Sequence, residues 1–318
     1  MDTHSRIAAE LFSQHGLNFE TAERAGGWTN AVWLNGDVVL RLSNEHDSDR
    51  IRREAARSAF LPLSVGYPNI IATGVAKGYE WSLSQRIPGE PLSAVWDGLH
   101  WDEKAATVRE VIGMMDAVHA VDVGAIEPLT HKRAWYNTFD EHSSLADIER
   151  YVARGLFTPA QGDVLRAILL RFYEQLCATN PVLCHGDITT DNLLWRDGHV
   201  VALLDFEHAA IAPSQLDVHS LINLALIPYD ESTQSDRILM HERVTEVESY
   251  VSGMISLFKP YLADQREKDL FMGYSVLFRQ RFLEFWLANP EGDIAHCDAY
   301  RKLQSLSDGH NGYLAPLL

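Results

Sequence analysis

Short strand-like apolar runs, separated by turn residues, occupy most of the first ninety residues of the chain. Asn35-Gly36 and Lys77-Gly78 lie between such runs, and Pro88-Gly89-Glu90-Pro91 ends them. Apolar runs bounded by these turns are typical of a meandering antiparallel sheet. The pattern predicts strands at residues 26–34, 37–42, 70–75 and 79–87.

Helical spacing dominates after the break at residues 88–91. Val108, Val111, Ile112 and Met115 form one apolar stripe, and Thr158 begins a capping box with proline in the first turn. The spacing predicts helices at residues 47–60, 102–121, 158–177 and 215–227, with further helical periodicity at 242–287.

The break at residues 88–91 predicts a hinge between two parts of the chain. We expect an N-terminal nucleotide-binding lobe at residues 1–87 and a C-terminal catalytic and substrate-binding lobe at 88–318. Within the second lobe, Phe282, Phe285 and Trp286 are expected to pack in the core, because an aromatic stripe at helical spacing is usually buried.

The candidate catalytic and metal-binding residues begin at His185-Gly186-Asp187. Asn192 follows five residues after Asp187, and Asp205 lies beyond a predicted hairpin. If Asp197-Gly198 is the turn, Leu194 pairs with Val201 and Asn192 with Leu203. Asp205 then lies on the same face as Asn192, roughly 7 to 8 Å away at the backbone.

This arrangement predicts a magnesium site, because Mg²⁺ favours one or two carboxylates together with phosphate oxygens. Asn192 and Asp205 are the expected ligands. Asp187, in the loop that enters the hairpin, is the candidate base for an acceptor hydroxyl. Glu207 either assists at the metal or substrate or is an ordinary surface carboxylate.

A phosphate-binding element is expected upstream of this metal site. Gly26 and Gly27 permit close approach of the backbone to phosphate, and Thr29 supplies a donor. With Asn35-Gly36 as the turn, Asn30 lies opposite Arg41, which places a cation on the same face as the glycine-rich loop. Arg41 is therefore the expected phosphate-binding side chain.

The motif His-Gly-Asp-x-x-x-x-Asn at residues 185–192, followed by Asp-Phe-Glu at 205–207, resembles the aminoglycoside phosphotransferase family. The fold of that family is similar to the protein kinases. The resemblance implies an α+β, protein-kinase-like bilobal fold, with a small N-terminal antiparallel sheet lobe and a larger, mainly helical C-terminal lobe.

The resemblance also implies roles for individual residues. Asp187 matches the catalytic aspartate, and Asn192 and Asp205 match the magnesium ligands. Glu54 is the best match to the helix glutamate that orients the basic residue, where Arg41 replaces the lysine of the kinases. The segment from Gln85 to Ile87 matches the main-chain site for the base of ATP or GTP.

The charge balance limits the classes of partner. The 318-residue chain has a formal net charge of −17, from 44 acidic and 27 basic residues. This excess disfavours nucleic acid and favours a cationic partner, although solubility alone also explains it. Neither a membrane-spanning run nor a signal peptide is indicated, so we expect a cytoplasmic protein.

These observations predict a small-molecule O-phosphotransferase. It would move the γ-phosphate of ATP or GTP to a hydroxyl of an aminoglycoside-like or other amine-bearing substrate, with Mg²⁺ as cofactor. The carboxylates expected to line an amine-binding cleft are Asp230, Glu231, Glu284 and Glu291.

Several alternatives remain open at this point. One is a kinase of a metabolite such as choline, homoserine or a sugar. The others are a non-catalytic nucleotide-binding pseudokinase, a protein kinase of unusual type, and a metal-dependent phosphoester hydrolase, which would not need the upstream glycine loop.

Overall fold

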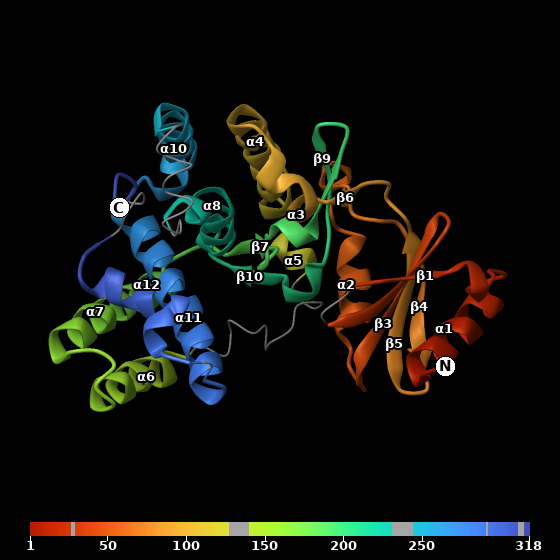
Figure 1. The fold of residues 1–318 in the computed structure, drawn as a ribbon, viewed down its shortest axis with the longest axis horizontal. Coiled ribbons are helices and arrows are strands. Elements are labelled where there is room, and N and C mark those ends of the chain that lie inside the picture. Colours follow the sequence, from red (N-terminus) through yellow and green to blue (C-terminus); the bar gives the residue numbers. More distant parts are fainter. Residues whose placement is uncertain (27–28, 127–139, 231–243, 291, 311–314) are drawn as a thin grey trace.

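The structure is a computed structural model that describes residues 1–26, 29–126, 140–230, 244–290, 292–310 and 315–318. A five-stranded antiparallel sheet forms one end of the molecule, and helices form most of the rest (Figure 1). The predicted α+β, kinase-like arrangement is therefore confirmed. The lobe boundary at residue 87 remains a prediction.

The N-terminal sheet has the strand order β1-β2-β3-β5-β4. Its strands are β1 (Glu23–Ala25), β2 (Asn30–Asn35), β3 (Val38–His46), β4 (Ile70–Ala76) and β5 (Tyr79–Gln85). Helix α1 (Thr3–Gln14) covers one face, and its Ile7, Leu11 and Phe12 join Trp33 and Leu40 in a small core. A 3₁₀ turn, η1 (Phe19–Thr21), links α1 to β1.

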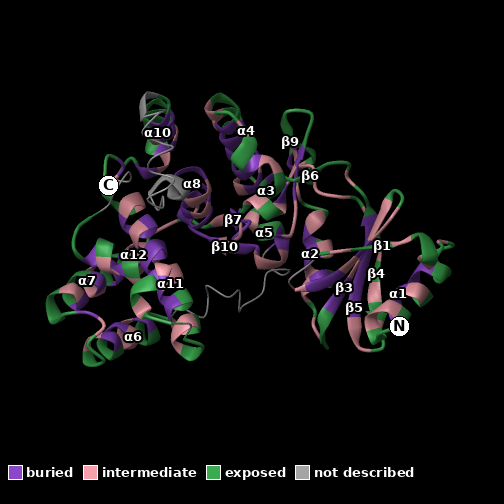
Figure 2. Ribbon diagram, viewed as in Figure 1, coloured by how far each residue is buried: buried purple, intermediate pink, exposed green. Residues whose placement is uncertain are grey.

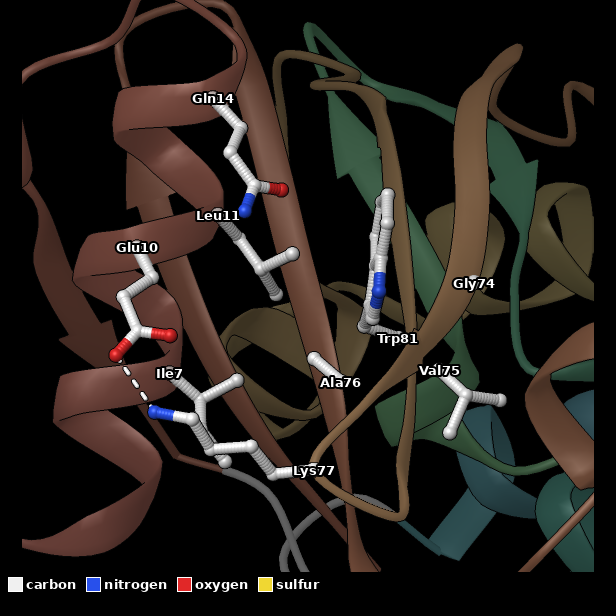
Figure 3. Close-up of a pocket in the computed structure, with 9 residues that line it drawn as sticks. All are labelled: Ile7, Glu10, Leu11, Gln14, Gly74, Val75, Ala76, Lys77 and Trp81. Carbon is white, nitrogen blue, oxygen red and sulfur yellow. Dashed lines mark hydrogen bonds and ion pairs between the residues drawn. The ribbon is translucent and has the colours of Figure 1, made fainter.

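A hollow of about 320 Å³ lies between α1 and the β4–β5 hairpin (Figure 3). Glu10 of the helix and Lys77 of the hairpin form an ion pair of 2.6 Å beside it. Both side chains are more than half exposed. The pair therefore adds little to stability, because solvent screens exposed ion pairs.

The first hairpin differs from its predicted register by two residues. Gly36 and Asp37 form the turn, so Asn30 lies opposite Ser43 and Arg41 lies opposite Val32. The predicted two-residue turn, Asn35-Gly36, would need positive φ at both residues. In the structure the turn residues are Gly36 and Asp37, and Gly36, the first of them, has φ 56°. A slip of two residues preserves the face of a strand, so Arg41 still lies on the same face as Asn30.

The second hairpin contains a bulge that the predicted register did not include. It joins β8 (Leu193–Arg196) to β9 (His199–Leu203) through the expected Asp197-Gly198 turn. Leu194 pairs with Ala202 instead of Val201, and the carbonyl of Asn192 accepts from the amide of Leu204 at 2.7 Å. The extra residue bends the strand.

Helix α2 (Arg50–Ser58) is shorter than predicted and buries charged residues. Its inward face carries Ile51, Glu54 and Arg57. The carboxylate of Glu80 on β5 accepts from the amide of Ile51 at 3.1 Å and from Arg52 at 2.6 Å, which fixes the start of the helix on the sheet. The helix lies between the sheet and the rest of the molecule (Figure 1).

The remainder of the chain is mainly helical and contains two buried hydrophobic clusters. Buried residues are purple in Figure 2. The helices are α3 (Leu92–Val95), α4 (Trp101–His119), α5 (Val123–Ile126), α6 (Glu141–Ala153), α7 (Pro159–Leu176), α8 (Gln215–Asp230), α10 (Val244–Phe258), α11 (Gln265–Ala288) and α12 (Asp298–Ser307). The 3₁₀ turns are η2 (Leu63–Val65), η3 (Trp96–Gly98), η6 (Thr190–Asn192), η7 (Phe206–His208), η8 (Lys259–Leu262) and η9 (Ile294–His296).

Two small sheets hold residues 182–212 among these helices. We call this stretch the catalytic segment because it carries Asp187, the predicted base. In one sheet, β6 (Glu90–Pro91) pairs with β8, and in the other, β10 (Ala210–Ala212) pairs with β7 (Val182–Cys184). The capping box of Thr158 and Gln161 at the start of α7 is confirmed. Among the described residues, none of the helices is long and apolar enough to cross a membrane.

Gly66 packs against β9 at a point where only glycine fits. It has φ 66°, and a Cβ atom there would collide with the carbonyl oxygen of Val201 on β9. We predict that Gly66→Ala lowers the free energy of unfolding by about 2–5 kcal/mol, from backbone strain plus overpacking. Urea denaturation measures this loss.

Gly16 provides the matched control for this substitution. It has φ 71°, but a Cβ atom there meets no heavy atom within 4 Å. Gly16→Ala should therefore cost only the strain, about 1–2 kcal/mol. Equal losses for the two variants would show that the contact between Gly66 and β9 is unimportant.

Candidate functional site

The loop that carries Asp187 is held from behind by a buried carboxylate. Asp217 on α8 is fully buried and accepts from the backbone amides of His185 and Gly186, each at 2.8 Å. The ring of His119 on α4 lies 2.9 Å from the same carboxylate. Asp217 and His119 are therefore structural anchors of this loop.

Cys184 lies close to His119 and Asp217, at a spacing that would suit a metal ion. Its thiol is buried, and burial together with Asp217 raises its pKa well above the ordinary value. The thiol already donates to the carbonyl oxygens of Ala212 and Pro213, at 3.6 and 3.4 Å. Because Asp217 is already engaged by two amides, the cluster is better explained as a hydrogen-bonded anchor.

His185 links this loop to the end of β9. Its Nδ1 accepts from the amide of Asp187 at 3.1 Å, so Nε2 carries the proton and donates to the carbonyl of Leu204 at 2.8 Å. The ring also packs edge-on against Phe206, with centroids 4.4 Å apart. The two ends of the catalytic segment are thereby joined.

Asp187 and Asn192 are in direct contact. The amide nitrogen of Asn192 donates to the backbone carbonyl of Asp187 at 2.9 Å and to its carboxylate at 3.0 Å. This contact fixes the carboxylate that the sequence assigns as the base. It also leaves the amide oxygen of Asn192 as the atom suited to a cation.

Asp205 reaches the site through a left-handed turn. It has φ 63°, at the point where β9 ends and η7 begins. Its Oδ1 accepts from Arg41 at 3.2 Å. The prediction that Asn192 and Asp205 are diagonal neighbours in a regular ladder is wrong in detail, because the bulge and this turn place Asp205.

Arg41 and Glu54 form the ion pair that the sequence predicted. Arg41 Nη1 lies 2.9 Å from both carboxylate oxygens of Glu54, whose side chain is 1% exposed. Glu54 also accepts from the hydroxyl of Tyr67 at 2.7 Å and from the amide of Phe206 at 3.1 Å. A single carboxylate thus connects the sheet, α2 and the catalytic segment.

These contacts set the protonation of the groups around Glu54. Burial alone would lower the pKa of Arg41, but the carboxylates of Glu54 and Asp205 outweigh it and hold that pKa well above its ordinary value. Burial and the neighbouring Glu54 raise the pKa of Tyr67 well above its ordinary value. Arg41 is therefore charged, and Tyr67 is a neutral donor.

Glu207 is a buried carboxylate and not a surface one. Its side chain is 3% exposed, and its Oε2 has no hydrogen-bond partner among the described residues. Burial and the adjacent Asp205 raise its pKa to about 7. An unpartnered buried oxygen beside a second carboxylate is the environment that a bound cation relieves.

Most of the predicted nucleotide and metal residues line one cavity of about 650 Å³. The cavity lies between the N-terminal sheet and the β8–β9 hairpin. The residues that the sequence predicted for the site and that line this cavity are Gly26, Thr29, Asn30, Arg41, Gln85, Ile87, Asp187, Asn192, Asp205 and Glu207. Glu54 lies behind Arg41, and Gly27 falls outside the described residues. The roles assigned to these residues stay predictions.

A second cavity, of about 880 Å³, lies on the other side of Asp187 among α8, α11 and α12. Asp187 and Thr189 line both cavities. Sequence reasoning missed this second cavity. The only signal for it was the aromatic stripe on the helix that contains Phe282.

The prediction that this stripe packs in the core is wrong for two of its members. Phe282 is 61% exposed and Phe285 is 72% exposed, and both line the second cavity together with the half-buried Trp286. Helical spacing places the side chains on one face but does not say what that face contacts. The buried face of α11 instead carries Leu277 and Leu283.

Of the four carboxylates expected in an amine-binding cleft, Glu284 is the one whose side chain the structure describes. Glu284 forms an ion pair of 2.7 Å with Arg150 and does not line the second cavity. Glu231, Glu291 and the side chain of Asp230 lie outside the described residues. The expected cleft of four carboxylates therefore has no support among the residues that the structure describes.

Comparison with known proteins decides the family. The profile described as "Phosphotransferase enzyme family" matches residues 20–241. The chain belongs to this family. An aminoglycoside 3'-phosphotransferase of Acinetobacter baumannii is 24% identical over 172 residues, which cover 53% of this chain and 64% of that relative. An aminoglycoside 3'-phosphotransferase of Escherichia coli is 22% identical over 190 residues, which cover 59% of this chain and 68% of that relative.

Solved phosphotransferase structures share the fold. An aminoglycoside phosphotransferase in complex with ADP and hygromycin B has a TM-score of 0.63 and 15% identity, covering 95% of this chain and 98% of that one. The GDP complex of an aminoglycoside 2'-phosphotransferase has a TM-score of 0.61 and 16% identity, covering 96% and 97%. The resemblance inferred from the motif is confirmed.

Removal of the Asp217 carboxylate tests its anchoring role. We predict that Asp217→Ala lowers the free energy of unfolding by about 3–5 kcal/mol, because two backbone amides and His119 lose a buried partner. Thermal and urea denaturation measure the loss. As a control, Asp308→Ala removes an exposed aspartate that contacts Gln161 at 2.9 Å, and should cost about 1 kcal/mol or less. Similar losses in both variants would contradict the anchoring role.

Proposed function

We propose that this chain is a magnesium- and nucleotide-dependent O-phosphotransferase that acts on a hydroxyl of a small molecule. The observation that carries the proposal is the position of Asp187 between two cavities. One cavity is lined by the predicted nucleotide and metal residues, and the other is open to a second substrate. Family membership and the nucleotide complexes of the solved neighbours support the same reaction.

The residues beside Asp187 fit a magnesium ion. Asn192, Asp205 and Glu207 supply amide and carboxylate oxygens, which are the ligands that Mg²⁺ prefers, and Glu207 has an unpartnered buried oxygen. When bound, the ion neutralises charge on the phosphates. We assign the first two residues as ligands and Glu207 as an additional one.

Arg41 is the proposed phosphate-binding residue. Glu54 accepts from its Nη1, and its Nη2 donates to Asp205 at the wall of the nucleotide cavity. Gly26, Thr29 and Asn30 would approach the phosphates from the glycine-rich loop. The backbone of residues 85–87 would bind the base, and either ATP or GTP suits a main-chain site.

Asp187 is the proposed catalytic residue. The acceptor hydroxyl oxygen forms a bond to the γ-phosphorus while the bond from that phosphorus to the bridging oxygen breaks, which releases ADP or GDP. The hydroxyl proton passes to the carboxylate of Asp187, which Asn192 orients at 3.0 Å. Positioning and electrostatic stabilisation account for most of such catalysis.

The proposed acceptor is a small molecule that bears a hydroxyl group. Solved neighbours are bound to hygromycin B, streptomycin and kanamycin, and the net charge of −17 also favours a cationic acceptor. The described residues around the second cavity do not reproduce that acidity. An amine is therefore compatible with the proposed reaction but is not required by it.

Replacement of the proposed base tests the function. We predict that Asp187→Asn lowers kcat by about 10²–10⁴-fold, the usual contribution of a general base, while the dissociation constant for Mg-ATP changes little. A coupled assay for ADP formation with an acceptor panel measures the rate, and calorimetry measures the affinity.

Asp197→Asn serves as the control, because Asp197 lies at the tip of the β8–β9 hairpin and its side chain is 92% exposed. The activity of this variant should equal that of the wild type. Undiminished phosphorylation by Asp187→Asn would exclude the proposed role. Phosphate release that needs no acceptor hydroxyl would favour the hydrolase alternative.

A further inference from the structure

Aromatic side chains form one wall of the cavity on the acceptor side of Asp187. Phe278, Phe282, Phe285 and Trp286 follow one another at spacings of four, three and one residues along α11, so they share a face of the helix. Trp96 lies on the same cavity from another element. We call the four α11 residues the aromatic wall.

Much of the aromatic wall is uncovered. Phe282 and Phe285 are 61% and 72% exposed, whereas Phe278 stacks on His219 with ring centroids 5.0 Å apart. Exposed aromatic groups that line a cavity beside reactive groups are typical of a ligand-binding surface. Covering them with an apolar ligand surface is favourable, because their rings are removed from water.

The charges of the described lining balance. Its two carboxylates are Asp187 and Asp298, and its two fixed cations are Arg279 and Lys302. Asp298 is already paired with Lys302 at 2.9 Å. The described lining therefore carries no excess of negative charge, whereas the whole chain has a formal net charge of −17.

His219, which also lines the cavity, is uncharged. It is 2% exposed, and burial followed by repulsion from Arg279 and Lys302 holds its pKa well below the ordinary value. Its imidazole is therefore neutral. A polycation placed here would lose water from each ammonium group, which is costly. Among the described lining residues only Asp187 and Asp298 could compensate, and Asp298 is already paired with Lys302.

We propose that the acceptor presents an apolar ring or hydrocarbon face to the aromatic wall and is not a polycation, with its hydroxyl directed to Asp187. The assignment rests on the proposed phosphotransferase function and specifies the substrate class of that site. Thr189 and Thr190, which also line the cavity, supply hydroxyls that suit a neutral polar edge of the same molecule. This acceptor differs in charge from the aminoglycosides bound by the solved neighbours.

Binding to the full chain tests the proposal with three probes, measured by calorimetry without nucleotide. Naphthylethanol is neutral and apolar, glucose is neutral and polar, and kanamycin is a polycation. We expect the dissociation constant of naphthylethanol to be at least about tenfold lower than those of the other two. Tighter binding of kanamycin than of naphthylethanol would overturn the proposal, and so would equal binding of glucose.

The aromatic wall is tested by the double substitution Phe282→Ala and Phe285→Ala. Both rings are exposed, so the variant should fold, which thermal unfolding checks. The affinity of this double variant for naphthylethanol should fall by at least about tenfold. Phe60→Ala is the control, because it removes an equally large, 41% exposed ring just after α2, and it should leave that affinity unchanged. Unchanged affinity in the double variant would also overturn the proposal.

Failure of the proposed function remains distinguishable from failure of this assignment. Mg-ATP affinity and ADP formation are measured on the same protein samples. If the wild type bound naphthylethanol through the aromatic wall but failed to bind Mg-ATP, the cavity chemistry would stand and the phosphotransferase function would fall. If it bound Mg-ATP and phosphorylated kanamycin in preference to neutral alcohols, only the acceptor assignment would fall.

Discussion

The buried carboxylate of Glu54 is the interaction on which the rest of the site depends. It accepts from Arg41 on β3, from Tyr67 before β4 and from the amide of Phe206 next to Asp205. An unpaired carboxylate with 1% exposure would be severely destabilising. All of these donors must therefore be in place together, which ties the sheet, α2 and the catalytic segment into one arrangement.

A second buried carboxylate fixes the opposite end of the catalytic segment. Asp217 holds the amides of His185 and Gly186, as Glu54 holds the amide of Phe206. Asp187, Asn192 and Asp205 lie between these two anchors. The residues proposed to handle the phosphates are thus preorganised by backbone contacts, and the acceptor cavity is left to vary in chemistry on the far side of Asp187.

The sequence predicted the elements of the site better than their pairing. The Asp197-Gly198 turn was correct, because its residues favour a two-residue loop. The bulge at Val201 and the left-handed Asp205 were missed, since neither leaves a signature in the order of residues. Arg41 was assigned to the correct face through a register that was wrong by two, because a strand repeats every two residues.

The environment of a side chain was harder to predict than its position. For Glu207 the sequence left a surface position and a role at the metal or substrate both open, and its side chain is only 3% exposed. Phe282 and Phe285 appeared to belong to the core, yet they line a cavity. Helical spacing fixes which residues share a face, whereas the neighbour of that face depends on tertiary contacts that the sequence pattern does not encode.

A double-mutant cycle between Arg41 and Glu54 tests the central claim most directly, with the dissociation constant of Mg-ATP as the readout and circular dichroism as the check on folding. If Glu54 acts by holding Arg41 at the phosphates, Arg41→Met and Glu54→Gln should each weaken binding by about tenfold or more, and the double variant should bind no more weakly than Arg41→Met alone. A double variant whose loss equals the product of the two single losses would contradict the account, because the two residues would then act independently.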